Sequence, residues 1–348
     1  MHNLAVAVEG FSSALDIAFL SSGVESLACA SLLAAAGQQV QLRGHDRLRP
    51  TSLIHERADR LGIPGTQLLH FAPLLQEADG YVRSPDILMV HGRAADYNEA
   101  LNIVANDARA GQTLFIIDAP LLTAFELGQR LDKLGKQLSV NIIETGPLFH
   151  SCKVDNSIVY ITAATSQVSI CGRTINETRA GLSIGRTFWK DLVPASNVIE
   201  RRLAHGNPLL GAAQRLFAVM SAQRGQECAS KEPSTLTSAE QSIIASMRNE
   251  LQTLGKQFNI SVPQEPPFSQ LSESLQKERD ELATLVRQDL VLVSDLAKLA
   301  YISTPTIDSI IELAGVTLGR DLRREGRTLE DLGLIGMDFH EIFELINS

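Results

Sequence analysis

A short stretch near the N-terminus has the residue types of a phosphate-binding turn. In the motif G-x-G-x-x-G, three glycines permit a tight turn, close approach of the backbone to a pyrophosphate, and close helix packing. Here Ser21, Gly23 and Ser26 stand at those positions, so only the middle glycine, which lets the backbone approach phosphate, is kept. The alternative is a domain of the same shape that binds no nucleotide. The predicted phosphate-binding residues are Ser21, Ser22, Gly23, Val24 and Glu25.

The next candidate residues follow the second predicted strand, QQVQL at residues 38–42. An acid after the second strand holds the ribose hydroxyls of NAD, whereas a nearby arginine favours the 2′-phosphate of NADP. Gly44 stands at the acidic position, with Arg43 before it and His45 after it. NADP is therefore the expected cofactor, NAD is the alternative cofactor, and a solvated loop is the alternative without a ligand.

A third candidate pair, His91-Gly92, directly follows the bare apolar run at residues 86–90. Ligands of open α/β sheets bind at the carboxyl ends of the strands. We therefore expect His91 and Gly92 to border the nucleotide, the alternative being a loop histidine with ordinary contacts.

Elements of alternating type have to position these residues. Short apolar runs predict strands, and longer segments with helical periodicity lie between them. The predicted strands are 16–20, 38–42, 86–90, 113–117 and 140–143, and the predicted helices are 24–36, 97–110 and 124–134. This alternation indicates an α/β fold with a doubly wound parallel sheet. Two β-rich stretches between residues 157 and 172 are expected to close the sheet at one edge.

Strand-like runs disappear after residue 204. Thr304 followed by Pro305 is a helix start, because proline is tolerated at the first helical position after an N-cap threonine. The predicted helices of this part are 209–221, 239–254, 271–286, 294–299, 305–318 and 328–332. The sequence therefore predicts two domains, residues 1–203 with the sheet and residues 204–348 with helices.

The composition narrows the classes of partner. The 348 residues carry a net charge of −9, which argues against a dedicated nucleic-acid or anionic-membrane partner. No uncharged apolar run reaches the roughly 18 residues that a membrane span needs. The four cysteines form no C-x-x-C pair, so we expect neither a metal site nor a disulfide framework. A cytoplasmic protein is the simplest expectation.

Three stretches resemble the octopine/nopaline (opine) dehydrogenase family. Residues 303–334, STPTIDSIIELAGVTLGRDLRREGRTLEDLGL, are similar to its T-P-x-x-D helix start, G-R-D turn and G-R-T-L-x-x-L-G-L ending. Residues 144–154, ETGPLFHSCKV, are similar to its T-x-P-Y-A-C-R segment. Asn207-Pro208 stands in the place of its N-x-N-P-x-x-H-P motif. The order agrees over most of residues 16–336, with the middle of the helical part poorly matched.

The resemblance implies a Rossmann-type sheet domain followed by an all-α domain like the C-terminal domain of 6-phosphogluconate dehydrogenase. It also implies reductive condensation, in which an amino acid and a 2-oxo acid form an imine that NAD(P)H reduces. Such a reaction needs a cationic group for each carboxylate and an acid/base for the protons. The implied partners are these two small molecules, with a homodimer as the candidate assembly.

The chain departs from the family at the catalytic histidine. Gly211 stands at that position, three residues after Pro208. His205, three residues before Pro208, and His150, in place of the family's tyrosine, are the candidates to compensate, because imidazole titrates near neutral pH. Asp308 matches the T-P-x-x-D acid, and its alternative role is that of a first-turn helix acid. The predicted catalytic residues are His205, His150 and Asp308.

Cationic and polar residues could hold the substrate carboxylates. Lys153 replaces the arginine of the family segment and keeps its charge without the bidentate fork. Four arginines lie within residues 320–327, and their alternative role is to interact with a helix dipole. The predicted substrate-binding residues are Lys153, Asn207 and Arg324.

These residues leave three hypotheses. The first is an NAD(P)H-dependent opine-type dehydrogenase, one version of which makes a metal-chelating opine. The second is a catalytically impaired relative that binds a nucleotide or a protein partner, which the serines of the turn and Gly211 favour. The third is a reductase of a ketopantoate-like 2-oxo acid, for which the helical part shows no convincing lysine motif.

Overall fold

The computed structural model consists of two compact units. The described residues are 15–43, 50–55, 68–70, 75–77, 85–94, 96–165, 167–204, 209–223, 236–263 and 274–348. The first unit comprises Met1–Ala119 and Arg130–Pro194, and the second comprises Pro120–Gln129 and Ala195–Ser348. The division into independently folding domains at residues 203 and 204 stays a prediction.

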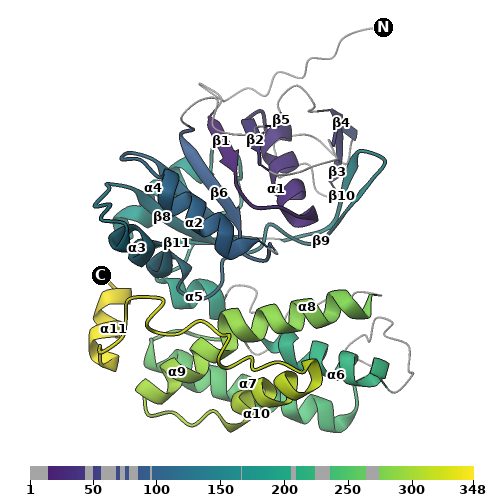
Figure 1. Ribbon diagram of the computed structural model, residues 1–348, viewed down its shortest axis with the longest axis vertical. Coiled ribbons are helices and arrows are strands. Elements are labelled where there is room, and N and C mark those ends of the chain that lie inside the picture. The colour runs from purple at the N-terminus through teal and green to yellow at the C-terminus, as the bar shows by residue number, and fades with distance from the viewer. Residues whose placement is uncertain are drawn as a thin grey trace, which may run out of the picture. The chain divides into compact units, whose positions relative to one another are not determined.

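An eight-stranded sheet forms the centre of the first unit (Figure 1), in the order β12-β11-β8-β7-β6-β1-β2-β5. Its strands are β1 (Asp16–Phe19), β2 (Gln39–Leu42), β5 (Leu75–Glu77), β6 (Ile87–His91), β7 (Thr113–Ile117), β8 (Asn141–Thr145), β11 (Val168–Gly172) and β12 (Leu192–Pro194). Neighbouring strands are parallel except β8 and β11. From β5 to β8 this is the 3-2-1-4-5-6 order of dinucleotide-binding sheets. The predicted doubly wound sheet is confirmed.

Alternation along the strands directs side chains to the two faces of this sheet. One face belongs to the main hydrophobic cluster, with Ile87 and Met89 of β6 among its members. The helix α1 (Val24–Ala35) packs on this face and also contacts β9 (Phe149–Asp155) and β10 (Ile158–Ala164) of a second sheet. Its residues from Ser26 to Ala34 are all buried, as expected of a helix that is covered on all sides. The other helices of this unit are α2 (Tyr97–Asp107), part of α3 (Thr123–Lys133) and α4 (Ile175–Gly185).

A second, four-stranded sheet has the order β4-β3-β10-β9. Its strands are β3 (Ser52–His55), β4 (Leu68–His70), β9 (Phe149–Asp155) and β10 (Ile158–Ala164). Asn156 and Ser157 both have positive φ, 47° and 63°, which suits a tight hairpin turn. The turn returns β10 antiparallel to β9. The expectation that residues 157–172 close the main sheet is therefore wrong for β10, whereas β11 does join that sheet.

The second unit is helical. Its helices, besides the start of α3, are α5 (Val198–Leu203), α6 (Leu210–Gln223), α7 (Ser238–Gln257), α8 (Leu275–Leu285), the π-helix η4 (Val286–Leu290), α9 (Val291–Leu299), α10 (Pro305–Leu318) and α11 (Phe339–Ile346). The helix α10 begins at Pro305, as predicted, and ends before Gly319, which is left-handed with φ 68°. The helix predicted at 328–332 is absent. A turn replaces it, because the Thr328 N–H and Oγ1 bond to Asp331 Oδ2 and Gly333 has φ 70°.

Buried ion pairs hold the second unit together. Asp289 of η4, fully buried, pairs with Arg202 of α5 and accepts the Leu121 N–H at 2.8 Å. Arg327 pairs with Glu126 of α3 and donates to the carbonyl oxygens of Leu121 at 2.7 Å and Gln288 at 2.9 Å. The segment from Pro120 to Gln129 is thus bonded to the helices through charged groups. Within the described residues, no helix is long and apolar enough to cross a membrane.

Candidate functional site

The loop between β1 and α1 has the shape that a phosphate-binding turn requires. Gly23, the residue before α1, has φ 102° and ψ 170°, a region that is almost restricted to glycine. A Cβ atom there would lie no closer than 3.8 Å to another atom outside its neighbours, Glu25 Oε2. The backbone conformation, and not the lack of space, therefore requires glycine at this position.

Serine hydroxyls replace the two outer glycines with a chain of hydrogen bonds. Ser21 Oγ accepts the His91 N–H at 2.8 Å and lies 3.0 Å from Ser26 Oγ. Ser26 Oγ donates in turn to the Ser22 carbonyl oxygen at 2.8 Å. Both Ser21 and Ser26 are fully buried. The small hydroxyls thus tie the ends of β1 and β6 to the start of α1, where glycines would leave the loop without side-chain bonds.

An anionic group already lies against this loop. Both carboxylate oxygens of Asp96 are 3.0 Å from the nitrogen of Ser22, whose N–H donates to them. Ser22 directly precedes Gly23, the N-cap of α1, so this N–H lies next to a helix start, where backbone N–H groups bind phosphate. The loop therefore fits the pyrophosphate of a nicotinamide dinucleotide in backbone shape, but its surroundings are acidic, with Glu25 in the first turn of α1.

His91 and Gly92 close the end of β6. Gly92 donates its N–H to the Ile117 carbonyl oxygen at 2.7 Å. The His91 ring is 3% exposed, stacks on Phe149, and accepts the Arg93 N–H at Nδ1 at 3.3 Å. Burial lowers the pKa of His91 and outweighs the nearby carboxylates of Asp118 and Glu25, which act to raise it. The imidazole is therefore neutral at neutral pH, and the N–H of Arg93 at Nδ1 favours the tautomer with the proton on Nε2.

The lowered pKa of His91 predicts a pH-dependent stability. The unfolded chain binds this proton at pH values below about 6.5, where the folded protein still excludes it. Stability is thus full above that pH and is lost as the pH falls toward the lower folded pKa. We expect the wild type to lose more stability between about pH 7 and pH 5 than His91→Asn. Thermal unfolding of both proteins across this range checks it, and parallel curves would contradict it.

The residues predicted to hold the nucleotide ribose lie at the end of β2. Arg43 is exposed and donates its backbone N–H to the Phe19 carbonyl oxygen at 3.2 Å. Its side chain is therefore accessible to solvent at the end of β2. His45 lies outside the described residues. The assignment of both residues to a 2′-phosphate stays a prediction.

Two of the predicted active-site residues lie on β9. Lys153 is exposed, and its Nζ lies 5.1 Å from the centroid of the Tyr160 ring. The backbone of His150 belongs to the same strand, and its side chain is outside the described part of the structure. His205 and Asn207 are also outside it. Gly211, in place of the family's histidine, is buried in the first turn of α6.

Asp308, in the first turn of α10, is held by two other segments. It accepts hydrogen bonds from Ser294 Oγ at 2.7 Å and from Arg323 Nη2 at 2.6 Å. Burial acts to raise the pKa of Asp308, but the bonds from Ser294 and Arg323 outweigh it and hold the pKa below its usual value. Asp308 is therefore an ionised carboxylate at neutral pH, suited to orient a neighbour and poorly suited to give up a proton.

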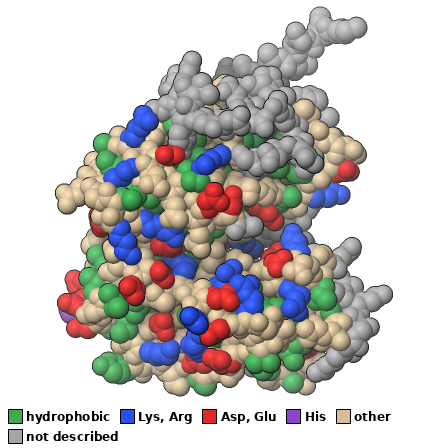
Figure 2. Space-filling view, in the orientation of Figure 1, with side chains coloured by type: hydrophobic (Ala, Val, Ile, Leu, Met, Phe, Trp, Pro, Cys, Tyr) green, Lys and Arg blue, Asp and Glu red, His purple; other side chains and the backbone are tan. Residues whose placement is uncertain are grey.

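The four arginines within residues 320–327 differ in their contacts. Arg320 pairs with Glu325, Arg323 pairs with Asp308 and Glu312, and Arg327 pairs with Glu126. Arg324 is exposed, and within the described residues its guanidinium makes no ion pair. Figure 2 shows Lys and Arg side chains interspersed with Asp and Glu on the face in view. Arg324 is thus the member of this group that is open to an external carboxylate.

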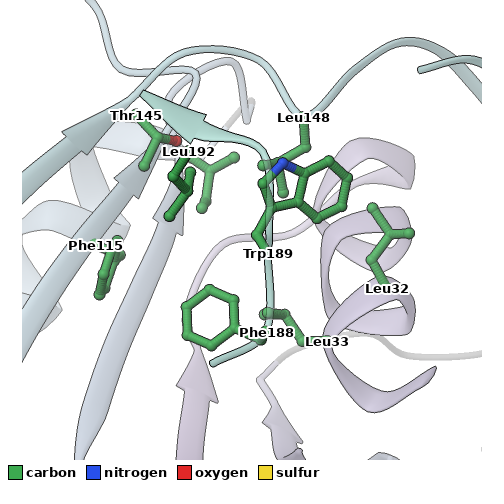
Figure 3. Close-up of a pocket in the computed structure, with 9 residues that line it drawn as sticks. Leu32, Leu33, Phe115, Thr145, Leu148, Phe188, Trp189 and Leu192 are labelled. Atoms are coloured by element: carbon green, nitrogen blue, oxygen red, sulfur yellow. The ribbon is translucent and has the colours of Figure 1, made fainter. Parts of the chain in front are cut away.

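A small apolar pocket in the first unit lies beside α1 (Figure 3). Its lining includes Leu32, Phe188 and Trp189, and Thr145 supplies its polar side chain. Such a lining offers no charge to a phosphate or a carboxylate. The pocket therefore does not compete with the loop at Gly23 as the candidate site.

Sequence reasoning missed the acid that contacts the loop. Asp96 precedes α2, and an aspartate before a helix is ordinarily taken for an N-cap, so its residue type did not point to the loop. Arg93 and Asp118, which pair with each other at the ends of β6 and β7, were missed as well. A signal available in the sequence was that Arg93 closely follows a predicted strand.

Comparisons with known proteins place this geometry in a wider context. No family model matches the chain. It is 42% identical over 52 residues to an opine dehydrogenase from Arthrobacter sp. (strain 1C). These 52 residues are 15% of this chain and 14% of that protein. The chain thus matches only a small part of that relative's length.

Solved structures are similar over almost the whole chain. Yersinopine dehydrogenase with bound NADP+ has a TM-score of 0.61 at 13% identity, covering 96% of this chain and 98% of that one. Octopine dehydrogenase with NADH and L-arginine has a TM-score of 0.63 at 10% identity, with the same coverage. A ketopantoate reductase from Ralstonia eutropha JMP134 has a TM-score of 0.57 at 11% identity, covering 87% and 98%. The predicted fold class is confirmed, because the chain shares the fold of these dehydrogenases over almost its whole length.

Proposed function

We propose that this chain is an NAD(P)H-dependent opine-type dehydrogenase that reduces the imine formed from an amino acid and a 2-oxo acid. The observation that carries the proposal is the glycine turn at Gly23, where the Ser22 N–H already binds an anionic group at the point where the strand order of the sheet reverses. The fold is similar to that of yersinopine dehydrogenase, which binds NADP+.

The proposed roles follow from the chemistry of each group. The loop from Ser21 to Glu25 would hold the pyrophosphate, with Arg43 and His45 at the 2′-phosphate of NADP. The cofactor, when bound, supplies the hydride. His150 and His205 are proposed as the acid/base residues, because imidazole as a residue type suits proton transfer near neutral pH. Asp308 is ionised at neutral pH. We therefore propose that it orients a neighbouring cationic or hydrogen-bonding group.

Lys153, Asn207 and Arg324 are proposed to bind the two substrate carboxylates. For Arg324→Gln we expect the KM of the 2-oxo acid to rise about tenfold with little change in kcat, because the lost contact is the same in the ground and transition states. Steady-state kinetics with the active substrate pair measures this. Arg320→Gln is the matched control, because Arg320 already pairs with Glu325, and its KM should stay within about twofold. An unchanged KM for Arg324→Gln would remove this residue from the site.

The overall proposal is tested by binding and turnover. The purified protein is titrated with NADPH and NADH by nicotinamide fluorescence, and pairs of amino acids and 2-oxo acids are then screened for oxidation of the bound cofactor. Oxidation that requires both substrates supports the opine-type reaction. Oxidation with a 2-oxo acid alone would instead indicate a reductase of the ketopantoate type.

A second candidate function is favoured by one observation. Gly211 is buried in α6 where the family has its catalytic histidine, and it offers no side chain for proton transfer. A relative without catalysis would bind the nucleotide or a protein partner and oxidise no cofactor with any substrate pair. That outcome, together with nucleotide binding, would replace the first proposal by this one.

The cellular setting, the assembly and the product class complete the proposal. Cys29, Cys152 and Cys171 are thiols, which suits a reducing compartment, so we propose the cytoplasm. We also propose a homodimer, which sedimentation analysis tests. An opine that chelates metal is a proposed product class, and mass spectrometry of the reaction mixture identifies it.

A further inference from the structure

Asp96 occupies a position whose ordinary function it does not perform. It is the N-cap residue of α2, yet its side chain makes no capping hydrogen bond to that helix. An aspartate at an N-cap ordinarily accepts an N–H from the second or third helical residue. Here both carboxylate oxygens lie 3.0 Å from the nitrogen of Ser22, 74 residues away in sequence. The carboxylate therefore binds the loop at Gly23 in place of capping its own helix.

In the nucleotide site proposed above, the Asp96 carboxylate lies at the turn that would receive the phosphates. Ser22 lies between the end of β1 and Gly23, and Asp96 follows β6, the strand next to β1. In dinucleotide-binding sheets the pyrophosphate lies at this turn, against the N–H groups at the helix start. A single N–H cannot serve a carboxylate and a phosphate at full strength, and the two anions repel each other.

We propose that Asp96 sets the affinity of this loop for the pyrophosphate of a nicotinamide dinucleotide, by holding the Ser22 N–H until the phosphate displaces it. The proposal rests on the function proposed above. The displaced carboxylate has a second place available, because α2 begins at Tyr97 without a side-chain cap. A change of side-chain rotamer would turn Asp96 from a partner of the loop into the cap of its own helix.

The test is the substitution Asp96→Asn in the full-length protein. Asparagine is as good an N-cap as aspartate, so the start of α2 is kept while the charge is removed. Its bond to the Ser22 N–H is weaker, because the acceptor is no longer ionised. We expect the Kd for NADPH or NADH, measured by fluorescence titration, to fall about tenfold or more. The Kd for adenosine, which has no phosphate, should stay the same.

Two further variants make the test specific. Asp107→Asn removes the same charge from the last residue of α2, so it should change the Kd for the dinucleotide by less than about twofold. Asp96→Ser, another good N-cap without charge, should repeat the gain of Asp96→Asn, and it replaces that variant if the asparagine protein does not fold.

The outcomes separate the inference from the function on which it rests. Equal dinucleotide affinity in the wild type and Asp96→Asn would overturn the role of Asp96 and leave the dehydrogenase proposal standing. An equal gain for adenosine or for Asp107→Asn would overturn it as well, because the effect would not be specific to phosphate at this loop. Absence of binding to every folded variant would overturn the proposed function itself.

Discussion

Replacing Asp289 by asparagine is expected to lower the free energy of unfolding of the helical unit by about 3–5 kcal/mol. Asp289 is fully buried and receives hydrogen bonds from the Leu121 N–H at 2.8 Å and from Arg202 Nε at 3.1 Å. Arg202 is itself only 3% exposed. Without the carboxylate the buried guanidinium loses the ion pair with Asp289, and the desolvation cost of that charge dominates the loss. Urea unfolding followed by circular dichroism measures it.

The control for this prediction is Asp295→Asn in α9. Asp295 pairs with Lys298, whose side chain is 57% exposed, so the change should cost at most about 1 kcal/mol. The double variant Asp289→Leu, Arg202→Met should recover much of the stability lost by the single change, because it removes both charges. A cost for Asp289→Asn as small as that of Asp295→Asn would contradict the importance of the buried pair.

Alanine at Gly23 is expected to abolish measurable binding of NADPH and NADH. The residue lies at φ 102° and ψ 170°, and a side chain there costs about 1–3 kcal/mol of strain. The loop would relax to a conformation in which the Ser22 N–H no longer faces the anion position. Fluorescence titration of the folded variant with both nucleotides measures the loss.

Gly135→Ala provides the comparison for that experiment. Gly135 follows α3 and has φ 67°, and a Cβ atom added to it would meet no atom within 4 Å. Alanine there should cost about 1 kcal/mol of stability and leave nucleotide affinity unchanged. If Gly23→Ala binds nucleotide as well as Gly135→Ala does, the phosphate does not lie at this loop, and the assignment of residues 21–25 to the cofactor fails.

Local sequence signals located much of the main sheet and several helices. The strand β7 and the helix α10 have the predicted bounds, 113–117 and 305–318. A central parallel strand is buried on both faces and reads as a continuous apolar run, while Pro305 and Gly319 mark the ends of α10 by their backbone preferences. The second sheet was not predicted, because its pairing of β10 with β3 joins segments about a hundred residues apart.

The candidate site was predictable only where backbone conformation leaves a mark on the sequence. Gly23 carried such a mark. Asp96 did not, because its bond to Ser22 depends on how β1 and β6 are paired. Arg324 was proposed as a substrate ligand, but the sequence does not show which of the four nearby arginines already have partners. Arg327, for example, pairs with Glu126, which is about two hundred residues away in the chain.

The bonds between the segment Pro120–Gln129 and the helices limit how the protein can be cut and recombined. A fragment that starts at Ala195 contains Asp289 and Arg327 but lacks the backbone groups of Leu121 and the carboxylate of Glu126 that bind them. We expect such a fragment to be insoluble or unfolded, because Arg327 loses the carboxylate of Glu126 and the buried Asp289, although it keeps Arg202, loses the Leu121 N–H. In chimaeras with proteins of the same fold, residues 120–129 should therefore be exchanged together with residues 195–348, because the two segments form one compact unit.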